Sequence, residues 1–289
     1  MANLKEVRNR IVSVGSTQQI TSAMKMVSAA KLKRAQDAIV QMRPYANKLK
    51  EILENLSGSL GGSDGAFSKQ RPVKNVLLVV ITSNRGLCGG FNSNVLKLAT
   101  LTIREKYKDC NISIVTIGKK ATDFFKRSSY KLVSSHNELF DGLTFKNVAP
   151  VAEKIMNDFV AGEYDKVELI YNQFKNAAVQ IPMDEQFLPV LPPKKDPSKK
   201  AASIDYIFEP DKEEIVQDMI PRALKTQLYK ALLDSHASEH GARMTAMHKA
   251  TDNAQELIRA LKLNYNKARQ AAITGEILEI VGGSEALNS

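Results

Sequence analysis

The feature that most constrains this chain is an apolar repeat of 3.5 residues that runs through residues 2–57. With heptad position a placed at residue 4 and position d at residue 7, 12 of the 16 a and d positions are apolar. A repeat of this length predicts one long helix in a coiled coil. We expect Pro44 to kink this helix or to mark a joint in it. The apolar positions are Leu4, Val7, Ile11, Val14, Leu32, Ala35, Ile39, Met42, Ala46, Leu49, Leu53 and Leu56.

The four polar exceptions are consecutive positions in the middle of the repeat, namely Gln18, Thr21, Lys25 and Ser28. Apolar residues lie beside them on a neighbouring face. We therefore expect the buried stripe to shift in this region to Ile20, Met24 and Val27.

The other end of the chain carries a second helical pattern. Residues 211–289 contain one proline, Pro221, and we expect the helix to start or kink near it. A seam with spacings of three and four residues follows, and a second stripe runs through Ile273, Ile277 and Ile280. Two long helices at opposite ends of a chain bury their stripes most simply by winding around each other in antiparallel fashion. The seam comprises Ala254, Ile258, Leu261, Tyr265, Ala268 and Ala272.

Between the two helical patterns, residues 58–71 are rich in Gly and Ser and predict a linker. Residues 72–210 alternate short apolar runs with helical patterns, which predicts an α/β domain with a largely parallel sheet. We expect strands over 76–81, 112–117 and 167–171, helices over 93–106, 120–126 and 148–160, and edge strands over 178–190 and 204–208. The domains expected are therefore 1–57, 58–71, 72–210 and 211–289.

The net charge of +10 is concentrated near the N-terminus. Residues 25–50 hold seven basic side chains and one acidic side chain, Asp37. This stretch indicates either a solvated helix face or contact with an acidic partner such as nucleic acid, anionic lipid or an acidic protein surface. Aromatic residues make up only 6% of the chain, which weakens the nucleic-acid hypothesis.

Few residues suggest catalysis. The Gly-rich segment Thr82–Gly90 follows an apolar strand, where a phosphate-binding loop belongs, but it matches neither dinucleotide nor Walker spacing and reads as a tight turn. His236 and His240 are four residues apart with no evident third ligand, and Cys88 and Cys110 lack metal-site spacing. We expect no catalytic residue, no metal and no cofactor. Three hypotheses remain: a mechanical coupling subunit, a nucleic-acid-binding protein, and a nucleotide-dependent enzyme.

Three blocks of the sequence resemble the gamma subunits of F-type ATP synthase, which form the central rotor shaft. The blocks are VRNRIVSVGSTQQITSAMKMVSAAK at Val7–Lys31, TSNRGLCGGFN at Thr82–Asn92, and the segment Arg243–Leu287. The family usually has Asp where this chain has Asn84, and often Ala at Gly282 or Gly283. The resemblance covers nearly the whole chain and implies an α/β fold class: a long antiparallel coiled coil of the terminal helices plus a Rossmann-like α/β globular domain.

The resemblance further implies a function and partners. The coiled coil would sit in a ring of three alpha and three beta subunits, and the α/β domain would rest on the membrane c-ring and hold the epsilon subunit. Proton or sodium flow would turn the shaft and drive ATP synthesis on the beta subunits, while the chain itself would be non-catalytic. We expect no nucleic acid, no membrane span and no transit peptide. The expected location is the cytoplasmic face of a bacterial plasma membrane (the inner membrane).

The resemblance also implies roles for individual residues. A beta-subunit catch loop would bind Arg269, Gln270, Thr274 and Glu276. Acidic lever segments of the beta subunits would meet Lys25, Lys31, Lys33 and Arg34. Coupling would depend on Met24 and Arg243, and contact with the membrane ring on Tyr206 and Glu209.

Overall fold

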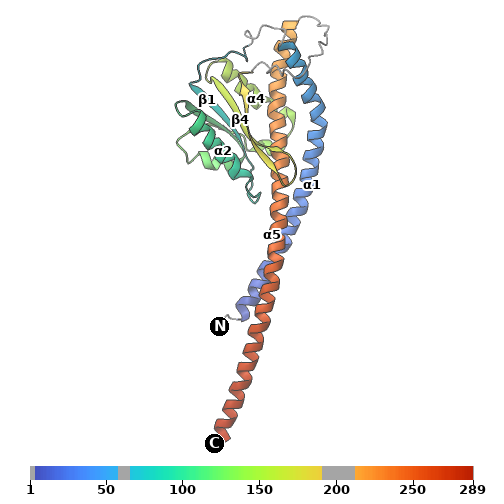
Figure 1. Cartoon of the computed structure of the whole chain (residues 1–289), viewed down its shortest axis with the longest axis vertical. Helices are drawn as coiled ribbons and strands as arrows, with labels where there is room; N and C mark the ends of the chain where they lie inside the picture. Colours follow the sequence, from blue (N-terminus) through green and yellow to red (C-terminus); the bar gives the residue numbers. More distant parts are fainter. Residues whose placement is uncertain (1–3, 58–65, 191–211, 289) are drawn as a thin grey trace. The chain divides into compact units, whose positions relative to one another are not determined.

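The computed structural model describes residues 4–57, 66–190 and 212–288. The chain divides into a helical unit, Met1–Ser28 with Arg243–Ser289, and an α/β unit, Ala29–Ala242. Helices α1 (Leu4–Ser57) and α5 (Lys212–Asn288) each contribute to both units and are labelled in Figure 1. Both helices continue through their proline, so Pro221 lies inside α5 and does not start it. The strand expected over 204–208 lies outside the described residues, as does 58–65 of the expected linker.

The α/β unit contains a sheet of five strands in the order β3-β2-β1-β4-β5. The strands are β1 (Asn75–Ile81), β2 (Asn111–Ile117), β3 (Lys131–Ser135), β4 (Lys166–Phe174) and β5 (Gln180–Leu188). Strands β3, β2, β1 and β4 are parallel, whereas β5 runs antiparallel to β4 at one edge. The predicted strands over 76–81, 112–117 and 167–171 are confirmed, and the edge strand within 178–190 is β5.

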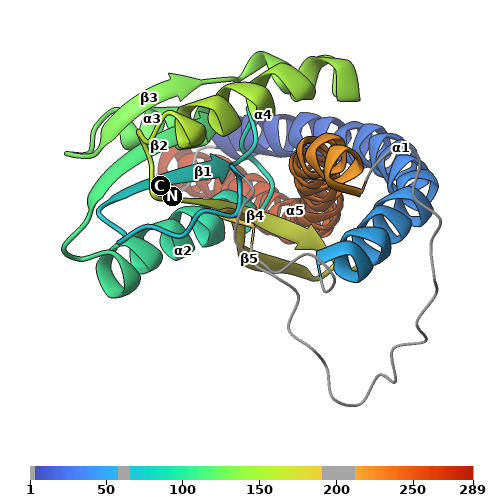
Figure 2. The ribbon, with the colours of Figure 1, turned by 90° about the horizontal axis from the view of Figure 1, so that it is seen from above.

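Helices cover both faces of this sheet (Figure 2). On one face, α2 (Phe91–Lys106) and α3 (Lys119–Phe125) pack on Val76, Leu78 and Val80 of β1. On the other, α4 (Phe145–Val160) and the segment Leu224–Leu232 of α5 pack on Leu77, Val79 and Ile81. A strand covered on both faces needs apolar residues on each, which explains why β1 is a continuous apolar run.

Strand β3 and the short 3₁₀ helix η1 (Glu138–Phe140) were not predicted. The strand KLVSS has only two adjacent apolar residues, Leu132 and Val133, and both are half-buried. Such a segment carries no period-2 signal, so its pairing with β2 decides its conformation.

In the helical unit, the two helices are antiparallel. The Thr21 Oγ1 and Thr251 Oγ1 atoms are 2.9 Å apart, and Lys25 Nζ lies 3.4 Å from His248 Nδ1. As residue numbers increase along α1, the numbers of the residues that they contact on α5 decrease. The predicted α5 seam from Ala254 to Ala272 is confirmed, because its six members are buried or half-buried and their neighbours, Gly275 aside, are exposed.

The expected shift of the α1 stripe is wrong at Ile20 and Val27, although Met24 is half-buried. Ile20 and Val27 are 60% and 58% exposed, whereas Thr21 and Ser28 are 8% and 3% exposed. The buried stripe continues through these polar heptad positions because a buried hydroxyl group can donate a hydrogen bond to a carbonyl of its own helix. The Ser28 hydroxyl donates to the Met24 carbonyl at 2.8 Å, and the Thr251 hydroxyl donates to the Met247 carbonyl at 2.8 Å.

Helix α5 extends beyond the start of α1. The pairing of Thr21 with Thr251 places Leu4 opposite residues near Ala268, so the last turns of α5 lie past the N-terminal end of α1 (Figure 1). The second stripe accordingly stays exposed, with Ile273 at 48% and Ile280 at 71%.

A buried carboxyl pair lies between α2 and the edge of the sheet. Glu168 on β4 is 3% exposed, and its acidic neighbour is Asp184 on β5. The Tyr107 hydroxyl donates to Glu168 Oε1, which also lies 3.0 Å from Lys166 Nζ, and Lys106 pairs with Asp184. Burial, together with the neighbouring acid, raises the pKa of Glu168 above its ordinary value of 4.5.

This raised pKa predicts a pH dependence of stability. Between pH 4.5 and the raised pKa the folded chain binds more protons than the unfolded chain, so stability falls as pH rises through this window. Each unit of raised pKa costs about 1.4 kcal/mol once Glu168 is ionised. In Glu168→Gln this loss should vanish. Urea unfolding of both full-length chains from about pH 4 to about pH 8 measures the difference, and parallel stability curves would contradict the prediction.

Candidate functional site

The two residues expected to govern coupling lie on different helices of the helical unit. Met24 on α1 is half-buried beside the seam, and Arg243 on α5 is only 7% exposed. Lys25, next to Met24, directs its amino group to His248, which lies 3.4 Å from the Asp252 carboxylate. The centre of the seam is therefore polar and cationic.

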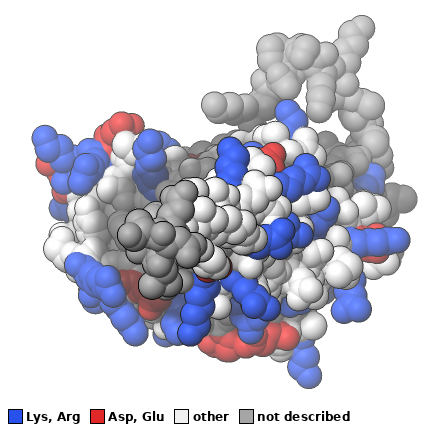
Figure 3. Space-filling view, turned by 90° about the horizontal axis from the view of Figure 1, so that it is seen from below, with Lys and Arg blue, Asp and Glu red and all other residues white. Residues whose placement is uncertain are grey.

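The basic residues expected to meet acidic levers fall into two kinds. Lys25 is half-buried in the seam, whereas Lys31, Lys33 and Arg34 are exposed. Figure 3 shows that Lys and Arg side chains are spread across the drawn face with fewer acidic groups among them. Spread charges of this kind attract an acidic surface at long range and form few tight pairs.

The expected catch-loop residues lie in the last turns of α5. Arg269, Gln270, Thr274 and Glu276 are all exposed, and they flank or lie beyond the point where α1 begins. Their side chains are thus accessible along a helix end whose apolar neighbours, Ile277 and Leu278, are also exposed. Tyr206 and Glu209, expected at the membrane ring, lie outside the described residues.

The Gly-rich segment after β1 forms a tight turn. Leu87 and Gly89 have positive φ angles of 62° and 57°. The first amides after the strand are occupied within the protein: Thr82 N–H donates to the Ile117 carbonyl at 2.8 Å, and Ser83 N–H donates to Asn92 Oδ1 at 3.0 Å. A phosphate-binding loop directs such amides at its ligand, so this geometry favours the interpretation as a turn.

The side-chain amide of Asn84 is hydrogen-bonded through both its nitrogen and its oxygen. Its Nδ2 donates to the Asn137 carbonyl at 2.7 Å, while its Oδ1 accepts from the Lys119 amide at 3.0 Å. An ionised carboxylate could make only the second of these bonds.

The histidine pair on α5 makes contacts within the α/β unit. His236 and His240 approach to 3.1 Å between their Nε2 atoms, and the His236 ring stacks on Phe140 with centroids 6.0 Å apart. Across the part of the chain that the structure describes, no group of three or more His, Cys, Asp or Glu side chains could hold a metal ion. The same described residues include no helix long and apolar enough to cross a membrane.

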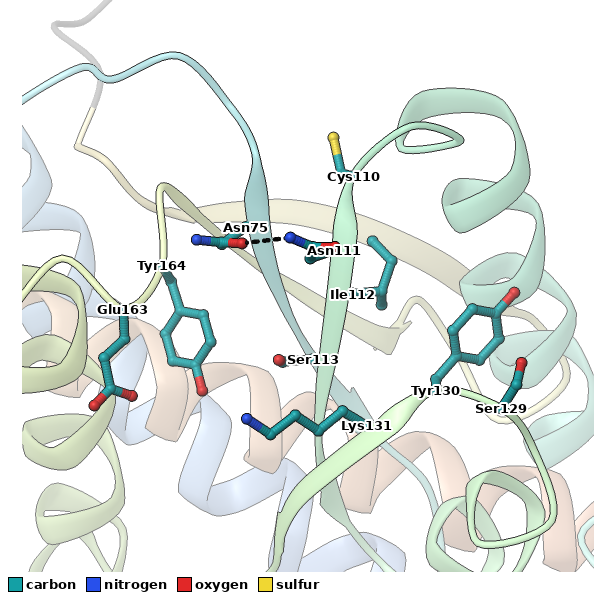
Figure 4. A pocket seen from close by; sticks show the side chains of 10 residues that line it. All are labelled: Asn75, Cys110, Asn111, Ile112, Ser113, Ser129, Tyr130, Lys131, Glu163 and Tyr164. Carbon is teal, nitrogen blue, oxygen red and sulfur yellow. Dashed lines mark hydrogen bonds between the residues drawn. The ribbon is translucent and has the colours of Figure 1, made fainter.

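A groove of about 770 Å³ opens where β1, β2 and β3 begin (Figure 4). Asn75 and Asn111 hydrogen-bond across it at 3.0 Å, and the amino group of Lys131 points toward the side that carries Tyr164. Ligands of parallel α/β domains bind at the opposite, carboxyl ends of the strands. The groove therefore gives no support to a nucleotide-dependent enzyme.

Sequence reasoning missed a set of buried residues where α5 meets the sheet. Asn172 is 1% exposed and Ser238 is fully buried. Their signal was faint: the α5 stripe of Leu224, Leu228 and Ala231 continues at the same spacing into serines and small residues. A polar continuation of an apolar stripe is easily taken as the helix leaving the core.

Comparison with known proteins shows relatives along the whole chain. The sequence model of the family described as ATP synthase matches residues 3–287. The ATP synthase gamma chain of Flavobacterium johnsoniae is 64% identical over 289 residues, which is all of both chains. A chain from the central stalk and c-ring structure of Tetrahymena thermophila mitochondrial ATP synthase is 28% identical, with a TM-score of 0.58 over 80% of this chain and 99% of that one.

The fold recurs in a more distant structure. A chain of the Euglena gracilis mitochondrial ATP synthase, solved with OSCP, F1 and the c-ring, covers 98% of this chain and 94% of its own length at 23% identity, with a TM-score of 0.71. Its likeness extends over both terminal helices and the sheet. Because the family model and a relative of high identity each span the full length, this chain belongs to the family of ATP synthase gamma chains.

Proposed function

We propose that this chain is the rotating shaft of an F-type ATP synthase and couples ion flow through the membrane c-ring to ATP synthesis or hydrolysis. One observation on the helical unit carries the proposal. Helix α5 extends beyond the end of α1 and exposes both apolar and hydrogen-bonding side chains there. Exposed leucine and isoleucine side chains on a helix end favour burial in another protein.

The shaft acts by presenting different faces to otherwise equal subunits. If the sides of the α1 and α5 pair differ in charge and apolar surface, each of three beta subunits meets a different environment. A shaft can shift a conformational equilibrium only by such differential contact. The chemistry of ATP belongs to the beta subunits, and the chain is non-catalytic by itself while it regulates ATPase activity and ion flow.

The proposed contacts follow the side chains already described. Arg269, Gln270, Thr274 and Glu276 offer hydrogen bonds to a beta-subunit loop from the exposed end of α5. Lys31, Lys33 and Arg34, with Lys25, attract acidic segments of the beta subunits. Exposed charge pairs contribute about 0–1 kcal/mol each, which suits contacts that must break in every rotation. Alpha subunits complete the ring, and the α/β unit holds epsilon and the c-ring.

The proposed location is the cytoplasmic side of a bacterial plasma membrane, with the chain held there through the c-ring. Tyr206 and Glu209 are the residues proposed to contact that ring.

Affinity purification of the tagged chain from native membranes tests the proposal. We expect alpha and beta subunits in equal amounts, threefold over this chain, together with ATPase activity and the c-ring. A truncation that removes the residues after Ala272 is the matched variant, and it should lower the yield of alpha and beta subunits while epsilon is retained. Recovery of the chain alone, or with nucleic acid, would contradict the rotor function.

A further inference from the structure

The segment Leu224–Leu232 of α5 forms part of the core of the α/β unit. Leu224, Leu228, Ala231 and Leu232 are at most 3% exposed and pack with β1, β4, β5 and α4. One helical turn further on, the same stripe becomes polar and remains buried. Ser235, Ser238 and Glu239 are 1%, 0% and 7% exposed. A buried polar side chain is stabilised where a partner faces it with a hydrogen-bonding group, and Ser238 has such a partner whereas the Ser235 hydroxyl has none among the described residues.

The sheet provides such groups at the carboxyl end of β4. The Ser238 hydroxyl donates to the Asn172 carbonyl at 3.1 Å, and the Asn172 side-chain amide donates to the Phe91 carbonyl at 2.9 Å. These two bonds connect α5, β4 and the first turn of α2. Next to them, Ala242 joins Cys88 and Phe91 in a small buried cluster, so α5 also contacts the Gly-rich turn.

Gly241 brings the α5 backbone against the hairpin between β4 and β5. A Cβ atom at this position would lie 3.1 Å from Ala177 Cα and 3.2 Å from the Ala177 carbonyl oxygen. It would also lie 3.5 Å from the ring of Phe174. Contacts this close are tighter than most Cβ contacts, so even a methyl group would require the hairpin to move by a few tenths of an ångström.

The position of these contacts in the topology is notable because β1 and β4 flank the switch point of the sheet. From β1 the chain continues to β2 and β3 on one side, and it returns to β4 on the other side of β1. The crevice outside the carboxyl ends of two such strands is where open α/β sheets bind their ligands. Here it is filled by α5, with Ser238, Gly241 and Ala242 in the place of a ligand.

We infer that this contact, which we call the α5 seat, is the joint through which torque passes between the α/β domain and the shaft. The seat is formed by Ser238, Gly241 and Ala242 on α5 with Phe91, Asn172 and Ala177. The inference rests on the proposed rotor function. Helix α5 runs unbroken from the seat to Asn288, so a twist applied at the seat is carried along one continuous helix. Gly241 and Ser238 are positioning residues in this joint.

The test compares ATP-driven proton pumping with ATP hydrolysis in inverted membrane vesicles that contain the whole complex. In Gly241→Leu, the added side chain must part α5 from the hairpin. We expect the number of protons pumped per ATP hydrolysed to fall at least about fivefold, because overpacking weakens a tight contact by about that factor or more. The loss should grow as the opposing proton gradient rises. Lys230→Leu is the matched control, because it adds the same side chain at an exposed position of α5, and it should keep the wild-type ratio.

A purely structural role would lower assembly, and hydrolysis and pumping would then fall in equal proportion. A wild-type ratio in assembled Gly241→Leu complexes at every gradient would overturn the inference. If that variant does not assemble, Gly241→Ala and Ser238→Ala are measured in its place. We expect a smaller fall in the number of protons pumped per ATP, and this fall should grow with the opposing proton gradient. Failure of the proposed rotor function would give a different result, because purification from wild-type membranes would then yield this chain without alpha and beta subunits.

Discussion

Gly118→Ala is expected to destabilise the α/β unit by about 3 kcal/mol or more, which is a large part of the stability of an ordinary domain. Gly118 joins β2 to α3 with φ of 109°, a conformation that side chains rarely adopt. An added Cβ would lie 2.0 Å from the backbone oxygen of Thr82. Thr82 cannot retreat easily, because its amide donates to the Ile117 carbonyl and its hydroxyl accepts from the Ala121 amide.

Denaturant unfolding of the full-length chain measures this effect, and Gly275→Ala is its control. Gly275 lies inside α5, and a Cβ there would meet nothing within 4 Å. This second substitution should raise stability by about 0.5–1 kcal/mol, because alanine loses less backbone entropy than glycine in a helix. Equal unfolding midpoints for Gly118→Ala and the wild type would show that the end of β1 can move, against the packing described above.

Met24→Lys is expected to uncouple ion pumping from ATP hydrolysis while it leaves assembly nearly intact. Met24 is half-buried beside Lys25, in a unit that already holds the buried Arg243. In the proposed complex, an added ammonium group there would attract carboxylates of a beta subunit and favour one orientation of the shaft. A preference of about 1.4 kcal/mol for one of three positions changes their populations tenfold.

The measurement is the ratio of protons pumped to ATP hydrolysed in membranes, with Met24→Leu as the control. Leucine keeps the approximate volume and the apolar character of methionine, so this control carries no added charge. We expect a reduced ratio for lysine alone. Equal ratios in the two variants would exclude a role for charge at this position, and a loss in both would assign the effect to packing.

Which side chains a helix buries was predictable from the sequence only where apolar residues mark the seam. Ala254 to Ala272 on α5 were located correctly because they recur at helical spacing among polar neighbours. On α1 the same reasoning failed at Ile20 and Val27, which are exposed, and at Thr21 and Ser28, which are buried. Hydropathy is a property of one side chain, whereas burial in a seam is fixed by the phase of the whole helix against its partner.

The candidate site divides in the same way. Arg269 and Thr274 are exposed, and their assignment to a beta-subunit contact stays a prediction that rests on the resemblance. Ser238, Gly241 and Asn172 escaped notice, because their importance depends on contacts between segments separated by more than 60 residues of sequence. The neighbouring sequence does not distinguish an exposed serine from a buried serine that donates a hydrogen bond to a carbonyl.

The sequence by itself therefore determined the long terminal helices, the central strands and the absence of phosphate-binding spacing. These features follow from local periodicity and spacing, which act within a few residues. The tertiary structure alone decided the pairing of β3, the polar centre of the seam and the occupation of the sheet crevice by α5. Each of these depends on which distant groups meet, and that is settled by the burial and hydrogen bonding of the whole chain and by no single segment.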